Sequence, residues 1–217
     1  MPVLPRSWWR RANKANQCEP FSMPCYGVWD AVGRFVAEIQ TGDFMREMIQ
    51  RRDAYGSQGL MGALDCATLY ALTRWERPAA VVESGGFVGM SSAFILKALM
   101  DEGLTTAKLY SIELSEDCDQ GVLIPEGDHL PSSIDMFLHD SSHSYRHMLW
   151  EFHEFWPWLR DGGLLVSHDV NLNAAFPEFV AQTYAHDKKT GRLDAQRTSH
   201  YEWGRWGYIG FAIKKSD

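Results

Sequence analysis

Hydrophobic residues recur at helical spacing through the first third of the chain. Between residues 28 and 52 an apolar side chain returns every three or four positions, and the polar stretch 41–43 interrupts the pattern. A further helical run covers 58–75 and stops before Pro78, because a residue that precedes proline disfavours the helical conformation. The pattern therefore predicts one helix on each side of the break at 41–43, and a third over 58–75.

Short apolar runs alternate with helical patterns in the rest of the chain. The predicted strands are 79–82, 108–114, 122–125, 134–139 and 164–167, and the predicted helices are 91–101, 145–159 and 174–186. Two strand-like runs, 193–201 and 208–214, follow with only 202–207 between them. The alternation favours an α/β fold, a Rossmann-like, doubly wound and mostly parallel sheet. The short last connection adds a C-terminal antiparallel strand.

The change of pattern near Pro78 divides the chain into two parts. Residues 1–76 are predicted to form an N-terminal arm and helices, which serve as a lid or contact a substrate or another subunit. Residues 77–217 are predicted to form the sheet domain. The sequence leaves the oligomeric state open, with a homodimer as one expectation.

Composition narrows the range of partners. The 217 residues carry a net charge of −7, which gives no basic surface for nucleic acid. No run of about 18 apolar residues is present to span a membrane, and residues 1–17 lack an apolar signal-peptide core. We therefore expect a cytoplasmic protein that acts on a small molecule. The four cysteines form no paired C-x-x-C sets, which argues against structural zinc.

The most informative segment is VVESGGFVGMSS, residues 81–92. It reads as a buried strand, an acidic residue, a glycine-rich turn and the start of a helix. Such a turn offers free backbone N–H groups and the positive end of a helix dipole to a ligand. Glycines allow the ligand to approach the backbone closely. Similar turns occur in many α/β proteins, so this segment alone does not identify the ligand.

Acidic residues follow the other predicted strands. Ligands of an open α/β sheet bind beyond the carboxyl ends of its strands, where Glu113, Asp128, Asp140 and Asp169 stand. Glu113 could accept both hydroxyls of a ribose, or it could be a solvated surface acid. Asp140 could take part in the reaction, or it could cap the helix predicted at 145–159.

Five motifs in this order resemble the class I S-adenosylmethionine-dependent methyltransferases. They are VVESGGFVGMSS, YSIEL, EGD, IDMFLHDSSHSY and LRDGGLLVSHDV, which together span about residues 79–170. The chain is most similar to the group that includes macrocin and catechol O-methyltransferase-like enzymes and cephalosporin-hydroxylase-like proteins. The resemblance identifies 77–217 as an S-adenosylmethionine-binding methyltransferase domain.

The resemblance also implies a cofactor site. Its residues would be Glu83, Gly85, Gly89, Ser91, Glu113, Asp128 and Asp140. Glu83 and the two glycines would line the methionine and ribose portions. Glu113 would bind the ribose hydroxyls, and Asp128 would approach the adenine amino group.

A metal and a base are implied at the later strand ends. Asp140 and Asp169 fall where metal-dependent relatives place Mg²⁺ ligands, and Asn171 could add an oxygen. His168 lies beside them, but imidazole is a softer ligand that Mg²⁺ does not favour. With Asp140, His143 is the candidate catalytic residue, since it follows Asp140 by three positions, where relatives carry their general base. Alternatively, His143 is a surface histidine in the first turn of the helix predicted at 145–159.

The expected function is metal-assisted O-methylation of a small-molecule hydroxyl on a sugar, polyketide or phenolic compound. The chain departs from the pattern of these relatives at two places, which keeps alternative functions open. Only residues 115–121 separate two predicted strands where relatives place a helix, and Phe87 stands where the commoner turn has a glycine. The alternatives are a non-catalytic scaffold with a Rossmann-like sheet, and a cephalosporin-hydroxylase-like protein with different chemistry.

Overall fold

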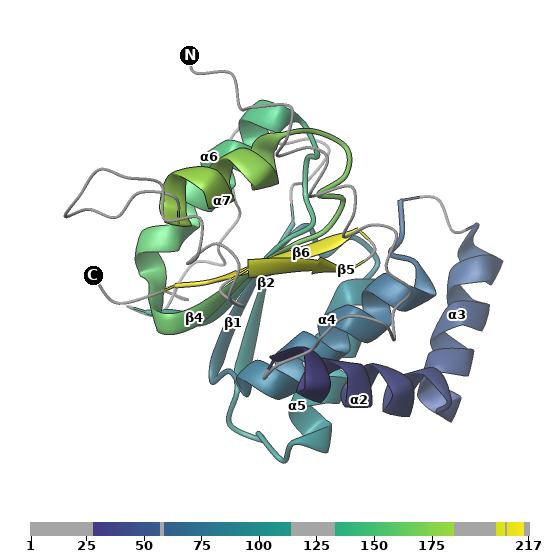
Figure 1. Ribbon diagram of the computed structural model, residues 1–217. Coiled ribbons are helices and arrows are strands. Elements are labelled where there is room, and N and C mark those ends of the chain that lie inside the picture. The colour runs from purple at the N-terminus through teal and green to yellow at the C-terminus, as the bar shows by residue number, and fades with distance from the viewer. Residues whose placement is uncertain (1–27, 57–58, 114–132, 185–202, 207, 215–217) are drawn as a thin grey trace.

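A six-stranded sheet forms the centre of the protein (Figure 1). The computed structural model describes residues 28–56, 59–113, 133–184, 203–206 and 208–214. The strands run in the order β2-β1-β3-β4-β6-β5. Their bounds are β1 Ala80–Ser84, β2 Lys108–Ile112, β3 Ile134–His139, β4 Leu159–Ser167, β5 Trp203–Trp206 and β6 Ile209–Ile213. The first four strands in this order are parallel, and β6 is antiparallel to both β4 and β5. The predicted fold class is confirmed.

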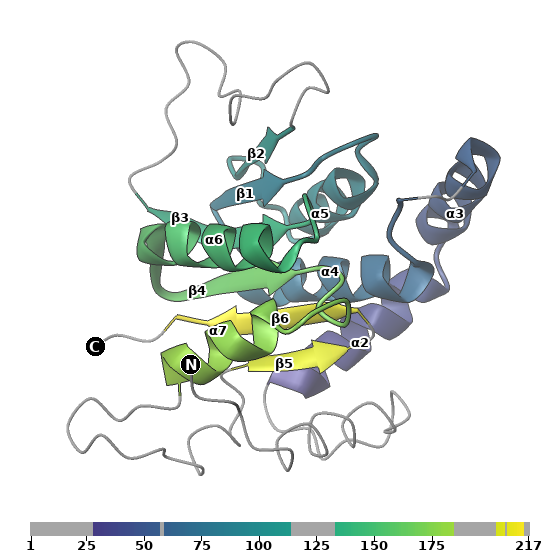
Figure 2. The same cartoon turned by 90° about the horizontal axis from the view of Figure 1, so that it is seen from above.

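Helices cover both faces of this sheet, which gives three layers (Figure 2). One face carries α4 (Ala63–Glu76) and α5 (Met90–Asp101), and α2 (Val28–Gln40) packs on α4. The helix α3 (Asp43–Tyr55) lies at the side of this layer. The other face carries α6 (Tyr145–Phe155) and α7 (Ala175–Tyr184), with the 3₁₀ turn η1 (Trp156–Trp158) after α6.

The two faces of the sheet have separate hydrophobic cores. In β1, Val81 belongs to the core under α4 and α5, whereas Val82 belongs to the core under α6 and α7. Successive side chains of a strand point to opposite faces, and a central parallel strand is buried on both. The first core also holds Val32 and Leu69, so residues from both sides of the predicted boundary at 76 pack together.

Most predicted elements appear close to their expected positions. The break at 41–43 separates α2 from α3, and β3 has the predicted bounds. The third helix begins at Ala63 rather than at 58, because Gly59 has a positive φ of 70° and Gly62 is extended. The helix predicted over 145–159 is α-helical only to Phe155, since proline at 157 favours the tighter 3₁₀ turn that follows.

The strand predicted at 164–167 is longer than expected. It begins at Leu159, and its pairing with β3 shifts between Ile134 and Met136. Residues 160–163, which lie between the predicted helix and the predicted strand, are therefore an irregular part of β4. It is held by the end of the chain, because Gly162 N–H donates to the Lys214 carbonyl and Lys214 N–H donates to Gly163.

The C-terminal antiparallel pairing is confirmed, but the predicted connection 202–207 is wrong, because most of it is a strand. Trp203–Trp206 forms β5, within the predicted connection 202–207, and it pairs with β6 from Trp203 opposite Ala212 to Trp206 opposite Ile209. The glycines in this stretch suggested a turn, but the tryptophans favour a strand. The predicted strands 193–201 and 122–125, and the short segment 115–121, lie outside the described residues.

No helix in the described ranges is long and apolar enough to cross a membrane.

Candidate functional site

The glycine turn after β1 is wedged between two other strand ends. A Cβ at Gly85 would lie 2.3 Å from the carbonyl oxygen of Asp140, and one at Gly86 would lie 2.3 Å from Oγ of Ser111. Gly85 also has a φ of +90°, which L side chains disfavour. Its N–H donates to the Ile112 carbonyl at 2.8 Å. Only glycine fits at this position, and the turn therefore touches the ends of both β2 and β3.

The other end of this turn has no close neighbour in the described part of the chain. Gly89 has a φ of +80°, and no described residue lies within 4 Å of the position that its Cβ would occupy. The helix α5 starts after it without a side-chain cap. The first-turn N–H groups of a helix lack intrahelical partners and carry a partial positive charge. This helix start can therefore accept a polar or anionic ligand group.

Glu83 is a buried acid behind the turn. Its Oε2 accepts hydrogen bonds from Ser92 and, at 2.7 Å, from Ser111. Its Oε1 is buried and has no hydrogen-bond partner in the described part of the chain. Burial raises the pKa of Glu83, and hydrogen bonds from the three serines Ser91, Ser92 and Ser111 partly offset that rise. The predicted cofactor residue Ser91 is thus a buried support for Glu83.

Glu113 follows β2 and is exposed. Its Oε2 accepts a hydrogen bond from the backbone N–H of Phe87, in the glycine turn. Phe87 has a φ of +42°, and 58% of its surface is exposed. The carboxylate therefore lies beside the glycine turn. Asp128, the predicted adenine contact, lies outside the described residues.

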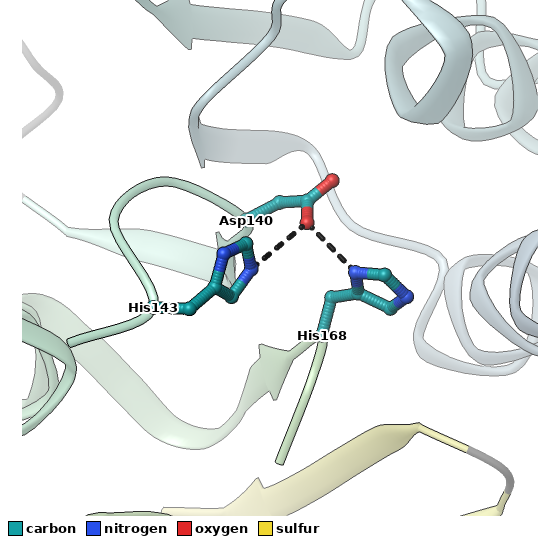
Figure 3. A group of neighbouring side chains, drawn as sticks. All are labelled: Asp140, His143 and His168. Carbon is teal, nitrogen blue, oxygen red and sulfur yellow. Dashed lines mark hydrogen bonds and ion pairs between the residues drawn. The ribbon is translucent and has the colours of Figure 1, made fainter. Parts of the chain in front are cut away.

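Three side chains meet beyond the ends of β3 and β4: Asp140, His143 and His168 (Figure 3). His168 Nδ1 lies 2.9 Å from Oδ1 of Asp140, and His143 Nε2 lies 3.7 Å from the same oxygen. Asp169 joins from the side, since its Oδ2 is 3.4 Å from His143 Nε2 and 3.7 Å from His168 Nδ1. Asp169 has a left-handed backbone with a φ of +53°, and in this conformation its side chain lies next to both histidines.

His168 is surrounded by carboxylates. On the side away from Asp140, its Nε2 lies 3.7 Å from Oδ2 of Asp65, a buried acid of α4. Asp65 in turn accepts the backbone N–H of Tyr208 at 3.0 Å. Burial has the largest effect on the pKa of His168 and lowers it, but Asp140, Asp65 and Asp169 together raise the pKa to about 10. The imidazole is therefore held in the cluster by acids on two sides.

A second buried network holds the loop that carries Asp140 and His143. Glu151 of α6 is its hub: Oε2 contacts His139 Nδ1 at 2.5 Å, and Oε1 accepts hydrogen bonds from Ser84 at 2.6 Å and Ser141 at 2.9 Å. His147 Nε2 also lies 3.0 Å from Oε1. Burial alone would raise the pKa of Glu151, but the contacts with His139, Ser84 and His147 lower it. The hub links the ends of β1 and β3 to α6.

Ser144, not Asp140, caps α6. The Ser144 side chain accepts a hydrogen bond from His147 N–H, which removes the capping alternative for Asp140. Asn171 is exposed, whereas its neighbour Asn173 contacts the site: Nδ2 donates to the His143 carbonyl at 2.9 Å, and Oδ1 accepts the Ala175 N–H at 2.8 Å.

The structure thus brings together Asp140, His143 and Asp169, but adds residues that sequence reasoning missed. Asp65 was not considered, although an acid among the apolar residues of a buried helix is a signal of a partner. His168 is not predicted as a ligand, because Mg²⁺ does not favour imidazole. Glu151 gave no signal, because a single glutamate in an amphipathic helix normally faces solvent.

Comparison with known proteins agrees with the fold. A family model for a methyltransferase domain matches residues 121–170, which include Asp140, His143 and His168. No curated protein matches the sequence. The structure is similar to that of the O-methyltransferase TomG from Streptomyces achromogenes, which is involved in tomaymycin synthesis and was solved with S-adenosylmethionine. The TM-score is 0.50 at 12% identity, over 88% of this chain and 100% of that one. It is also similar to an O-methyltransferase from Bacillus cereus in complex with S-adenosylhomocysteine, with a TM-score of 0.49 at 10% identity, over 83% of this chain and 96% of that one.

Proposed function

We propose that this chain is an S-adenosylmethionine-dependent methyltransferase that methylates a hydroxyl oxygen of a small molecule, such as a sugar, polyketide or phenol. One observation carries the proposal: the glycine turn that can bind a ligand is in direct backbone contact with Asp140, the centre of the histidine cluster. A cofactor site and a proton-accepting group therefore adjoin. The matched methyltransferase domain and the fold shared with TomG, which binds S-adenosylmethionine, support the assignment.

The residues around the turn fit this cofactor. No described residue lies within 4 Å of a Cβ at Gly89, and α5 starts without a side-chain cap, so a ligand group could approach the backbone there. Oε1 of Glu83 is a buried acceptor without a partner among the described residues, and such atoms normally find one. Glu113 would accept the ribose hydroxyls, and we assign Asp128 to the adenine amino group by its motif. S-adenosylmethionine supplies a methyl group that is already activated on a sulfonium.

His143 is the proposed proton acceptor. Although 29% of its side chain is exposed, Nε2 itself is buried and has no hydrogen-bond partner among the described residues, so a substrate hydroxyl has to enter the cluster to reach it. Asp140 and Asp169 lie 3.7 Å and 3.4 Å from that nitrogen. The carboxylates orient the ring and stabilise the imidazolium that forms when it takes the proton. By contrast, His139 is fully buried and bound to Glu151, so it is a structural group.

The residues present do not fit Mg²⁺. This ion prefers oxygen ligands and usually keeps several waters, but here the carboxylates of Asp140 and Asp169 stand together with the two imidazoles of His143 and His168. Asn171, the third predicted oxygen donor, is exposed. The proposed proton transfer therefore needs only the side chains of this chain.

The N-terminal helices are the proposed wall of the substrate pocket. The ring of Tyr55, the last residue of α3, packs edge-on against Phe87 of the glycine turn, with centroids 5.8 Å apart. Both residues remain more than half exposed, at 57% and 58%. An aromatic substrate could stack there next to the proposed methyl donor.

Transfer of a labelled methyl group from S-adenosylmethionine to a panel of small hydroxylated acceptors tests the proposal. We expect at least one phenolic, sugar or polyketide acceptor to be methylated on oxygen. His143→Gln should slow transfer by roughly 10²–10⁴-fold, the usual contribution of a general base. His153→Gln is the matched control, since His153 is an exposed histidine of α6. Equal rates in both variants would contradict the role of His143.

A further inference from the structure

The histidine cluster has the composition of a transition-metal site. Its donor atoms are one carboxylate oxygen from Asp140 and one ring nitrogen each from His143 and His168, all within 4.8 Å of one another. Neutral imidazole suits zinc, iron, cobalt and nickel, whereas a set of oxygens suits magnesium. We propose that these three residues bind a divalent transition-metal ion of the zinc class rather than Mg²⁺.

The spacing of the donors fits such an ion. Bonds of about 2.1 Å to nitrogen and oxygen place neighbouring donors of a tetrahedral site about 3.4 Å apart. The structure gives 2.9 Å between His168 Nδ1 and Asp140 Oδ1, and 3.7 Å between His143 Nε2 and the same oxygen. Both imidazoles point at one carboxylate oxygen (Figure 3). A cation between the three groups would replace these contacts with little movement of the chain.

The surroundings of His168 are those of a metal ligand. A ligating histidine usually directs its other ring nitrogen at a carboxylate, which fixes the ring. Nε2 of His168 faces Asp65 at 3.7 Å, and Asp65 is itself held by the Tyr208 N–H. His168 is 7% exposed and Asp65 is 5% exposed. The protein therefore buries an acid at the far side of this ring, where it would orient the ring toward an ion.

The remaining ligand positions have local candidates. Asp169 Oδ2 lies 3.4 Å from His143 Nε2, so a small rotation of the carboxylate brings a fourth donor to the ion. His143 is partly exposed, so its ring forms the solvent-facing side of the cluster, while its Nε2 is buried inside. A bound ion would use the same Nε2 lone pair that accepts a proton in the proposed reaction, so the two roles of His143 exclude one another in one molecule.

Cobalt binding tests the metal site without substrate or cofactor, and so separately from methyl transfer. The chelator-treated full chain is titrated with Co²⁺ while the visible absorption of the ion is recorded. We expect saturation at one Co²⁺ per chain, displacement of Co²⁺ by equimolar Zn²⁺, and no displacement by a large molar excess of Mg²⁺. Displacement by Mg²⁺, or the absence of a saturable cobalt spectrum, would overturn the proposal.

Three variants locate the ion. His143→Gln and His168→Gln should each weaken Co²⁺ binding by about 100-fold or more, because each removes a direct ligand. His153→Gln, which replaces an exposed histidine outside the cluster, should bind Co²⁺ like the wild type. His143 is partly exposed, so its replacement should leave the fold intact, which circular dichroism can check. Cobalt binding that survives in the folded His143→Gln variant would refute the assignment.

Discussion

Nδ1 of His168 lies 2.9 Å from Oδ1 of Asp140, although the whole of α6 separates the two residues in the sequence. They meet because β3 and β4 are neighbouring parallel strands, with His139 paired to Ser167. Each residue follows its strand directly, and parallel strands end at the same edge of the sheet. The contact joins the site of proposed chemistry to a buried acid on α4, since the other nitrogen of His168 faces Asp65.

Replacing Asp140 should separate chemistry from cofactor binding. Asp140→Asn removes the charge that orients His143 and His168, but it leaves the backbone that touches the glycine turn. We expect methyl transfer to fall by roughly 10²-fold or more, while affinity for S-adenosylhomocysteine changes little. Single-turnover rates and calorimetry measure the two effects. Asp161→Asn, which changes an exposed aspartate outside the cluster, is the control. If Asp140→Asn lost cofactor affinity as strongly as it lost transfer rate, Asp140 would instead belong to the cofactor site.

Replacing Glu113 should have the opposite effect. Glu113→Gln should weaken S-adenosylhomocysteine by about 1–3 kcal/mol, or roughly 5- to 150-fold, because the ribose hydroxyls lose a charged acceptor. The same change weakens the hydrogen bond from Phe87 N–H that anchors the turn. Calorimetric titration measures the change. Glu154→Gln, an exposed acid of α6, should bind normally, and an unchanged affinity for Glu113→Gln would remove Glu113 from the site.

Two glycines of the turn should differ in their tolerance of alanine. At Gly85 a Cβ would meet the Asp140 carbonyl at 2.3 Å, whereas at Gly89 it would meet no residue that the structure describes within 4 Å. Both have a positive φ, so both substitutions carry backbone strain of about 1–3 kcal/mol. Only Gly85→Ala adds a clash with backbone. In urea denaturation we expect it to lower the free energy of unfolding clearly more than Gly89→Ala; equal losses would show that the strand ends separate freely.

Glu76 should make stability depend on pH. Burial raises its pKa to about 7 from the ordinary 4.5, and Asp135 adds to the rise while Arg160 opposes it. A carboxyl whose pKa is raised by folding binds its proton more tightly in the folded state, so the free energy of unfolding falls as pH rises from about 4.5 to 7 and levels off above. Glu76→Gln should flatten this part of the curve. Denaturation at several pH values in both proteins checks it, and identical curves would contradict it.

Cys66 should be inert in the folded protein. It is a free cysteine with 0% exposure in α4, and burial, followed by the charges of Asp65 and Asp140, raises the pKa of its thiol. Because the thiolate is the reactive form, alkylating reagents at mildly alkaline pH should label Cys66 only after unfolding in urea. Peptide mass spectrometry reports the site of labelling. Rapid labelling in the native protein would show that α4 opens.

The sequence was sufficient for the fold and for part of the site. The order of strands and helices follows from periodicity, and the strand-end rule places Glu113, Asp140 and Asp169 at one edge. His143 follows because it is three residues from Asp140, on the same loop. These inferences succeed because each concerns residues close in sequence to a predicted strand end.

The partners that come from distant elements could not be predicted. Asp65 lies in α4 and reaches His168 only through the packing of that helix on the sheet. Glu151 meets His139 and Ser84 across the core between α6 and the sheet. Helix periodicity says which face is buried, but not which polar side chain of another element it will meet. The start of β5 was missed for a similar reason, since its pairing with β6 outweighs the turn preference of its glycine.

Calorimetric titration of the purified chain with S-adenosylhomocysteine tests the central claim most directly. The account predicts one binding site per chain with a dissociation constant of roughly micromolar, about −8 kcal/mol, and a clear loss of affinity in Glu113→Gln. Absence of binding at millimolar ligand would mean that the glycine turn and its flanking acids do not form a cofactor site, and would contradict the assignment as a methyltransferase.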